Sequence, residues 1–364
     1  MMCRPVPYPG SVTRIAAVSG VLPSHRYAQR ELADALAALR PAGSERALAD
    51  RLYASAGVET RYLALPLESY PGLTGFGAAN DAFIAAAVEL GEAAVAEALS
   101  ASGLAAAEVD LVLSTSVTGI AAPSVEARLA SRVGLREDVR RIPVFGLGCA
   151  AGAAGVGRLH DFLAGRPDGV ALLLSTELCS LTLQRADTST ANLIATALFG
   201  DGAGALLAVG ADHPRHADGP GPLVLASRSR LYPGTERLLG WDIGDAGFRI
   251  LLGAELPELV RLHVAEEVSS FLAAHDLKPG DVATWICHPG GPRVLDALGE
   301  ELGLPSDALA FSRRSLAGCG NLSSASVLHI LRDAVVAGPP PPGSYGLMVA
   351  LGPGFASELV LLRW

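Results

Sequence analysis

The fold is decided by one stretch of the chain, Val144-Phe145-Gly146-Leu147-Gly148-Cys149-Ala150-Ala151-Gly152. The apolar residues 142–145 predict the end of a buried strand, and Gly146 and Gly148 supply backbone angles that residues with a Cβ adopt reluctantly. The small residues that follow predict a closely packed helix, with Cys149 at its N-terminus, where free N–H groups favour a thiolate. Cys149 is therefore a candidate nucleophile, although a buried structural cysteine fits this stretch as well.

Composition excludes several classes of protein. The 364 residues are 50% hydrophobic and 18% charged, with a net charge of −9, which argues against an extended nucleic-acid surface. No apolar run approaches the ~20 residues of a membrane span, and the first residues lack the apolar segment of a secretory signal. Five cysteines, an odd number without extracellular context, predict reduced thiols in a cytoplasmic protein. No CxxC pair or HxxxH helix is present, so no metal site is expected.

Hydrophobic patterning predicts strands alternating with helices. We expect strands at 12–22, 109–115, 142–145, 169–175, 205–209, 223–227, 282–287, 346–351 and 356–362, and helices at 29–39, 45–56, 83–100, 124–133, 150–162, 258–275, 292–303 and 327–337. Residues 210–222, rich in Gly, Pro, Asp and His, predict a connecting loop at the midpoint.

The two halves of the chain resemble each other. Each has a glycine turn, one polar residue (Cys149, then Asn321) and a small-residue helix, and each is expected to end in a strand-glycine-strand hairpin, at 198–209 and 348–362. This pattern predicts two α/β units, residues 1–212 and 213–364, whose helices share a central layer.

Two further residues suit a cysteine nucleophile, which needs a proton partner and donors for a developing oxyanion. His288 ends an expected strand and precedes Pro289-Gly290-Gly291, where α/β folds present ligands. Asn321 follows Gly320 and precedes a serine-rich helix start. Taken singly, His288 also fits a core histidine and Asn321 a helix N-cap, but all three at glycine-flanked junctions favour a catalytic set.

Arg46, Arg51 and Arg61 concentrate positive charge near the N-terminus. They fit either solvated surface arginines or a phosphate clamp at a tunnel mouth.

Together these motifs resemble the type III polyketide synthases, the chalcone/stilbene synthase family of the thiolase superfamily. The matching motifs, in the family's order, are Gly148-Cys149-Ala150-Ala151-Gly152, Leu198-Phe199-Gly200-Asp201-Gly202, His288-Pro289-Gly290-Gly291-Pro292, Gly320-Asn321-Leu322-Ser323-Ser324-Ala325 and Gly352-Pro353-Gly354. The resemblance covers nearly the whole chain, from about residue 14 to residue 364.

The resemblance implies an α/β fold, the thiolase-like duplicated αβαβα layered fold, and a homodimer. It implies that Cys149 carries the starter and the growing polyketide, that His288 and Asn321 bind the thioester carbonyl, and that Phe199 is a gatekeeper. A Cys149 thiolate paired with a His288 imidazolium would be reactive at neutral pH. Decarboxylation of malonyl-CoA gives an enolate, whose oxygen two donors stabilise. The substrates are CoA thioesters, and no metal or other cofactor is implied.

The resemblance also assigns cavity and CoA positions. The second gatekeeper falls at Ile250, with Phe248 nearby, and a methionine that reaches the partner's cavity falls at Ala122. Other cavity positions are Val117, Cys179, Thr182 and Trp241, together with Gly352 and Pro353 of the last glycine turn. The positions expected to bind CoA are Arg46, Arg51, Arg293 and Ser323.

The product depends on these cavity positions. The smaller Ile250 and Ala122 favour a channel for an aliphatic acyl starter, giving an alkylresorcinol or alkylpyrone. The alternative is malonyl-primed synthesis of a small aromatic, a phloroglucinol or a tetrahydroxynaphthalene. An initiating ketoacyl-carrier-protein synthase shares the fold and the three residues, but its histidine lies in a His-Gln-Ala-Asn sequence. A dinucleotide-binding oxidoreductase is disfavoured because Cys149 occupies the place of the phosphate, and a non-catalytic thiolase-fold subunit is disfavoured because all three residues are present.

Overall fold

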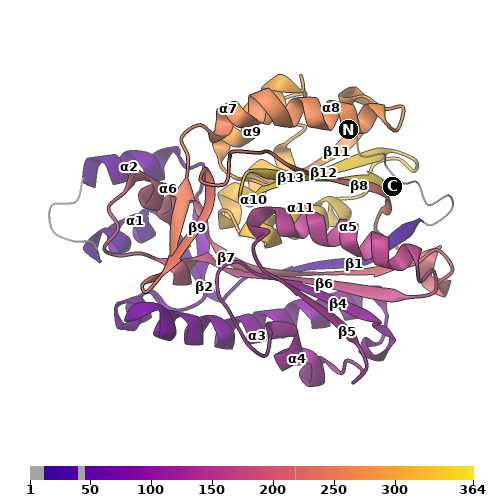
Figure 1. The fold of residues 1–364 in the computed structure, drawn as a ribbon, viewed down its shortest axis with the longest axis horizontal. Coiled ribbons are helices and arrows are strands. Elements are labelled where there is room, and N and C mark those ends of the chain that lie inside the picture. The colour runs from indigo at the N-terminus through magenta and orange to yellow at the C-terminus, as the bar shows by residue number, and fades with distance from the viewer. Residues whose placement is uncertain (1–11, 40–45, 218) are drawn as a thin grey trace.

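The computed structural model describes residues 12–39, 46–217 and 219–364 and is built around one nine-stranded mixed sheet (Figure 1). The strand order is β11-β12-β13-β8-β1-β7-β6-β4-β5. The two parts of this sheet meet where β1 pairs with β8 at Thr13↔Val224 and Arg14↔Leu223. Helices α5 and α11 lie between the two parts, and further helices cover both outer faces (Figure 1). This arrangement confirms the expected αβαβα layering.

One part of the sheet comes from the first half of the chain. Its strands are β1 (Thr13–Val21), β4 (Leu111–Thr115), β5 (Arg140–Val144), β6 (Val170–Leu178) and β7 (Asp201–Val209). Its outer face is covered by α3 (Gly75–Ser102) and α4 (Val125–Val133).

The other part comes from the second half. Its strands are β8 (Leu223–Leu231), β11 (Val282–Cys287), β12 (Tyr345–Gly352) and β13 (Ala356–Arg363). The helices around it are α7 (Leu256–Leu259), α8 (Ala265–Ala273), which follows a π-helical segment at Val260–Val264, α9 (Pro292–Glu301) and α10 (Ala310–Cys319).

The central helices are α5 (Ala151–Ala164) and α11 (Ser326–Val336). Both are largely buried because sheet strands pack against them from two sides. Small residues make this approach possible: a Cβ placed on Gly155 of α5 would come within 2.5 Å of Leu173. The Ala/Gly-rich sequence therefore forms a helix that two sheet layers can enclose.

A smaller lobe lies at one end of the molecule (Figure 1). It consists of α1 (Gln29–Ala38), α2 (Arg46–Ser55), α6 (Thr190–Leu198) and two antiparallel strand pairs. One pair is β2 (His25–Ala28) with β3 (Thr60–Leu63), and the other is the hairpin of β9 (Leu239–Gly244) with β10 (Gly247–Leu252). The sequence analysis did not predict β2, β3, β9, β10, α6 or α10.

Two local expectations were wrong. Strand β5 is not buried: it forms one edge of the sheet, and Ile142 and Phe145 are 45% and 49% exposed. Residues 198–209 do not form a hairpin, because α6 ends at Leu198 and leads directly into β7. Both errors arose because short apolar runs do not distinguish a buried strand from an edge strand or a helix end.

Candidate active site

The turn before α5 places Cys149 as expected. Strand β5 ends at Val144, Gly146 and Gly148 have φ of +98° and +48°, and a 3-10 turn over Gly148–Ala150 leads into α5. A Cβ on Gly148 would lie 2.6 Å from the ring of Pro353, so glycine is required both by conformation and by space. Cys149 thus lies at the N-terminus of a buried helix.

The Cys149 thiol makes a long hydrogen bond to a residue in the second half of the chain. Its Sγ donates to Ser323 Oγ at 3.5 Å. Burial raises the pKa of Cys149 to about 12, and the nearby Glu177 carboxylate contributes in the same direction. Burial therefore favours a neutral thiol when Cys149 is considered alone.

Beneath the cysteine lies a buried carboxylate that the sequence analysis missed. Glu177 is fully buried at the end of β6, and its Oε1 accepts from Ser323 Oγ at 3.1 Å and from Ser324 Oγ. Its Oε2 accepts from the backbone N of Val117 and from Thr118 Oγ1, both at 3.0 Å. Burial raises the pKa of Glu177, whereas these donors lower it. The signal in the sequence was one charged residue near the end of an otherwise uncharged, fully buried strand.

The position of Asn321 is fixed by hydrogen bonds of both its side chain and its backbone. Its Oδ1 accepts from the backbone N of Ser323 at 2.8 Å, and its own backbone N donates to Leu198 O at 2.8 Å. Gly200 N donates back to Asn321 O at 3.0 Å, which completes a parallel bridge between residues 199 and 321. Asn321 is therefore no simple helix cap: its backbone is tied to the segment that carries Phe199.

His288 follows β11, as the sequence predicted. Its backbone N donates to Val349 O of β12 at 2.8 Å, its ring is 5% exposed, and Nδ1 has no hydrogen-bond partner among the described residues. Burial lowers the pKa of His288 to about 3. Gly291, three residues later, lies beside Leu198, whose carbonyl accepts the backbone hydrogen bond of Asn321. A Cβ on Gly291 would lie 3.6 Å from the Leu198 side chain.

These burial effects oppose both charges of the expected thiolate–imidazolium pair. In the described part of the chain, the hydrogen bond of Cys149 Sγ goes to Ser323 and not to the His288 ring. A charged pair can form only by transfer of one proton between the two groups, which places opposite charges together and leaves the net charge unchanged.

A cavity of about 30 Å³ lies beside Cys149. Trp241 and Ile250 are directly paired across the β9–β10 hairpin and close it from one side. Gly352 does not line this cavity. It packs against the turn that carries Cys149, where a Cβ on Gly352 would come within 2.6 Å of Ala150. The residues from the sequence analysis that do line it are Val117, Cys149, Cys179, Phe199, Trp241, Ile250, Ser323 and Pro353.

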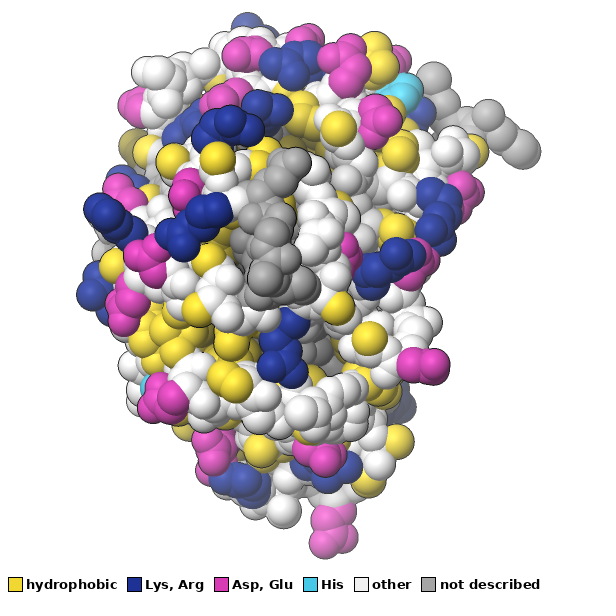
Figure 2. Space-filling model, turned by 90° about the vertical axis from the view of Figure 1, so that its left-hand side faces the viewer, with side chains coloured by type: hydrophobic (Ala, Val, Ile, Leu, Met, Phe, Trp, Pro, Cys, Tyr) yellow, Lys and Arg dark blue, Asp and Glu magenta, His cyan; other side chains and the backbone are white. Residues whose placement is uncertain are grey.

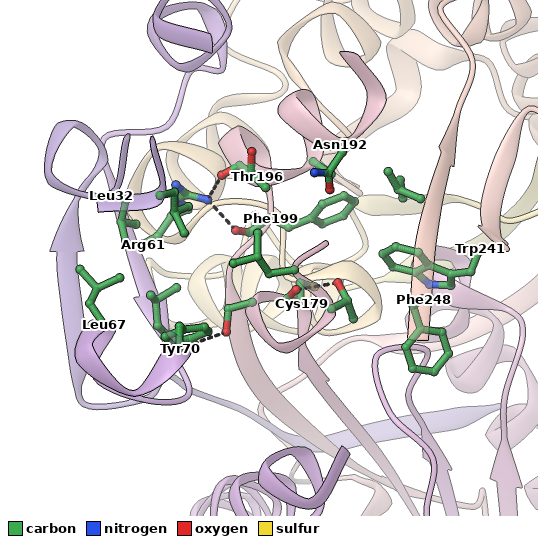
Figure 3. A pocket seen from close by; sticks show the side chains of 17 residues that line it. Leu32, Arg61, Leu67, Tyr70, Cys179, Asn192, Thr196, Phe199, Trp241 and Phe248 are labelled. Carbon is green, nitrogen blue, oxygen red and sulfur yellow. Dashed lines mark hydrogen bonds between the residues drawn. The ribbon is translucent and has the colours of Figure 1, made fainter. Parts of the chain in front are cut away.

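Two further cavities adjoin it, and Figure 3 shows the side chains that line the first of them. One of about 40 Å³ shares Cys179, Phe199, Trp241 and Ile250 with the first and also includes Thr182. The other, of about 200 Å³, shares Thr182 and Phe248 with the second. The expected cavity residues thus lie along one run of connected space, with two exceptions. Gly352 packs behind it, and Ala122 lies on the exposed surface.

The residues expected to bind CoA differ in their exposure. Arg46 is exposed and paired with Asp34 and Asp50, and Arg51 and Arg293 are also exposed. On the end of the molecule that carries α1 and α2, basic side chains are interspersed with acidic ones (Figure 2). Ser323, in contrast, is buried between Cys149 and Glu177, where it contacts the nucleophile rather than an exposed phosphate site.

Arg61 differs from the surface arginines with which the sequence grouped it. Its side chain is 2% exposed and lines the cavity of about 40 Å³. The interpretation of Arg61 as a solvated residue or a phosphate clamp is therefore wrong.

Within residues 12–39, 46–217 and 219–364, no three His, Cys, Asp or Glu side chains are grouped so that they could hold a metal ion. In the same described residues, no helix is long and apolar enough to cross a membrane.

Comparisons with known proteins agree with this geometry. Residues 9–213 match the family model "Chalcone and stilbene synthases, N-terminal domain", and residues 223–364 match the corresponding C-terminal domain. The chain is 57% identical to a 1,3,6,8-tetrahydroxynaphthalene synthase of Streptomyces peucetius subsp. caesius, over 97% of this chain and 93% of that protein. It is 36% identical to a putative chalcone synthase of Bacillus subtilis (strain 168), over 86% and 89%.

A solved structure is also similar. The crystal structure of the 1,3,6,8-tetrahydroxynaphthalene synthase of Streptomyces coelicolor A3(2), a bacterial type III polyketide synthase, superposes with a TM-score of 0.91. It covers 96% of this chain and 99% of that one at 32% sequence identity.

Proposed function

The chain belongs to the chalcone and stilbene synthase family of type III polyketide synthases, and we propose that malonyl-CoA supplies both its starter and its extender units. The product we propose is 1,3,6,8-tetrahydroxynaphthalene, the compound named for the relative that is 57% identical. This is the malonyl-primed alternative of the sequence analysis, in preference to an alkylresorcinol or alkylpyrone.

The observation that supports a small starter is the space around the nucleophile. The cavity beside Cys149 measures about 30 Å³ and its neighbour about 40 Å³, well below the ~300 Å³ of the smallest sites for drug-sized ligands. Ile250 does not open a channel, because Trp241 lies directly across the hairpin from it. A growing chain would extend toward the cavity of about 200 Å³.

The residues perform the reaction in this proposal as follows. The Cys149 sulfur attacks the thioester carbonyl of malonyl-CoA, its proton passes to His288, and the CoA thiolate leaves. The next malonyl-CoA binds with its thioester carbonyl facing His288 and Asn321. It loses CO2 to give an enolate, whose oxygen these two donors stabilise. The enolate carbon attacks the thioester on Cys149, the Cys149 sulfur leaves, and the chain is two carbons longer. No cofactor is needed in these steps.

Incubation with single substrates tests the proposal. With malonyl-CoA alone we expect the mass of tetrahydroxynaphthalene or its oxidised quinone in the product mixture, and added medium- or long-chain acyl-CoA should leave that product dominant. No aromatic product from malonyl-CoA alone, together with alkylpyrones or alkylresorcinols from acyl-CoA starters, would overturn it.

We also propose that the protein is a cytoplasmic homodimer that associates through β5. Its free edge carries exposed apolar side chains, Ile142 and Phe145, and Ile120 nearby is 44% exposed. An apolar sheet edge of this kind favours pairing with a second copy. The free thiols of Cys149, Cys179, Cys287 and Cys319 support a reducing compartment. Sedimentation should show a dimer that I142K weakens, and a monomer at all concentrations would contradict the proposed association.

A further inference from the structure

Arg61 lies between the end of α6 and the segment that carries Asn321. It belongs to β3, and its Nη1 donates to the carbonyls of Thr196 at 2.5 Å and Phe199 at 3.0 Å (Figure 3). These carbonyls belong to the C-terminal end of α6, where backbone acceptors lack partners within the helix and a positive charge is favourable. Arg61 therefore fixes the point at which α6 ends and the Phe199 segment begins.

The same segment holds Asn321. Leu198 O accepts from Asn321 N at 2.8 Å, and Gly200 N donates to Asn321 O at 3.0 Å. The Asn321 backbone is therefore hydrogen-bonded to both chain neighbours of Phe199. Gly320 packs against the stem of Arg61: a Cβ there would lie 3.2 Å from Arg61 Cδ and 2.7 Å from Leu198 O. Arg61 thus contacts both strands of the 199–321 bridge, one through hydrogen bonds and one through packing.

Other roles for Arg61 fit the structure less well. Its guanidinium is too deeply buried to meet the phosphates of CoA at the surface. No carboxylate of the described residues lies within ion-pair distance of it, so it does not serve as half of a salt bridge there. Its face lies 5.6 Å from the centre of the Tyr53 ring, which holds the side chain in place.

We propose that Arg61 is a positioning residue for Asn321. Its hydrogen bonds fix the carbonyls of Thr196 and Phe199 and thereby the position of the 199–321 bridge. The position of this bridge determines where the Asn321 carboxamide lies. The inference rests on the proposed function, in which that carboxamide donates to the thioester oxygen. A displacement of about 1 Å at such a donor can reduce a rate on the order of 100-fold.

A double-mutant cycle tests this role. We would measure kcat and KM for malonyl-CoA decarboxylation in the full-length protein and in R61M, N321A and R61M/N321A. N321A should lower kcat by about 10²–10³-fold. R61M should lower kcat by about 10–100-fold and leave KM within about twofold. The double variant should match N321A within about twofold, since Arg61 acts through the residue already removed.

Three controls separate positioning from general damage. R14M removes an arginine that also donates to two backbone carbonyls, those of His216 at 2.9 Å and Gly221 at 3.0 Å, but outside the site, and it should leave kcat unchanged. Iodoacetamide should alkylate Cys149 in R61M at the wild-type rate. R61K keeps one cation near the carbonyls and should recover part of the lost kcat; if R61M does not fold, R61K replaces it in the cycle.

The outcomes are distinct. If the effects of R61M and N321A multiply, or if R61M (or R61K in its place) has wild-type kcat, this inference is overturned while the proposed function stands. If N321A itself decarboxylates malonyl-CoA at the wild-type rate, the role of Asn321 and this inference both fall. The identity of the product is decided separately by the substrate panel above.

Discussion

Two turns with nearly the same backbone meet in the site, and only one carries a nucleophile. The first, the cysteine turn, spans residues 146–152, and the second, the asparagine turn, spans residues 320–326. Each ends in a 3-10 segment directly before a central helix, Gly148–Ala150 before α5 and Ser323–Ala325 before α11. The first residues of these segments have φ of +48° and +49°. The turns also touch, because a Cβ on Gly152 would collide with Ser324 O.

This equivalence changes one expectation. The sequence paired Cys149 with Asn321, but the 3-10 segments place Ser324 at the position of Cys149. Ser324 is fully buried, and its Oγ hydrogen-bonds Glu177 and, at 2.7 Å, Ser175 Oγ. Cys149 has the long contact to Ser323 and lines a cavity. The same turn can therefore carry a structural residue, when the side chain is fully hydrogen-bonded, or a nucleophile, when the side chain faces a cavity.

The largest expected effect comes from giving the cysteine turn the hydroxyl of its counterpart. C149S should reduce polyketide formation by at least about 10³-fold, because a serine hydroxyl gives up its proton to His288 far less readily than a thiol and is a far weaker nucleophile than a thiolate. Decarboxylation of malonyl-CoA should persist, since it depends on His288 and Asn321. Product and CO2 would be measured in the same reactions. Polyketide formation near the wild-type rate would show that Cys149 is not the acyl carrier.

A smaller effect is expected on the other side of the comparison. S324A removes a hydroxyl from the network around Glu177, and we expect the free energy of unfolding to fall by about 1–3 kcal/mol. Turnover by the folded protein should change by less than about threefold, because Ser324 touches no reacting atom in our account. Denaturant unfolding and steady-state rates check both parts. A variant as stable as wild type but as inactive as C149S would contradict the division into scaffold and nucleophile.

Much of the layered core could be predicted from the sequence, because long apolar strands and the small-residue helix α5 carry strong local patterns. Strand β11 was predicted with its bounds, residues 282–287. The sequence also indicated Cys149, His288 and Asn321, each within two residues of a glycine. Local patterns could not show that β5 is an edge strand, because exposure there depends on which strands lie beside it.

The contacts that support the site were less accessible. Arg61 resembles a surface arginine in sequence, but its hydrogen-bond partners lie at the end of α6, more than a hundred residues away. Glu177 likewise acquires its donors from Val117, Thr118, Ser323 and Ser324 after folding. Such side chains are defined by partners remote in the chain, whereas a glycine turn is defined by its own few residues.

The most direct test of the account is the pH dependence of Cys149 alkylation by iodoacetamide in wild type and in H288Q. Burial, with the Glu177 carboxylate acting in the same direction, raises the pKa of Cys149 to about 12, and burial lowers that of His288 to about 3. In our account the mutual attraction of the two charges holds the charged pair at neutral pH. We predict a wild-type rate that is constant from about pH 7 upward, and an H288Q rate that rises about tenfold per pH unit over the same range. A wild-type rate that rises with the same slope as H288Q would contradict the claim that His288 activates the sulfur.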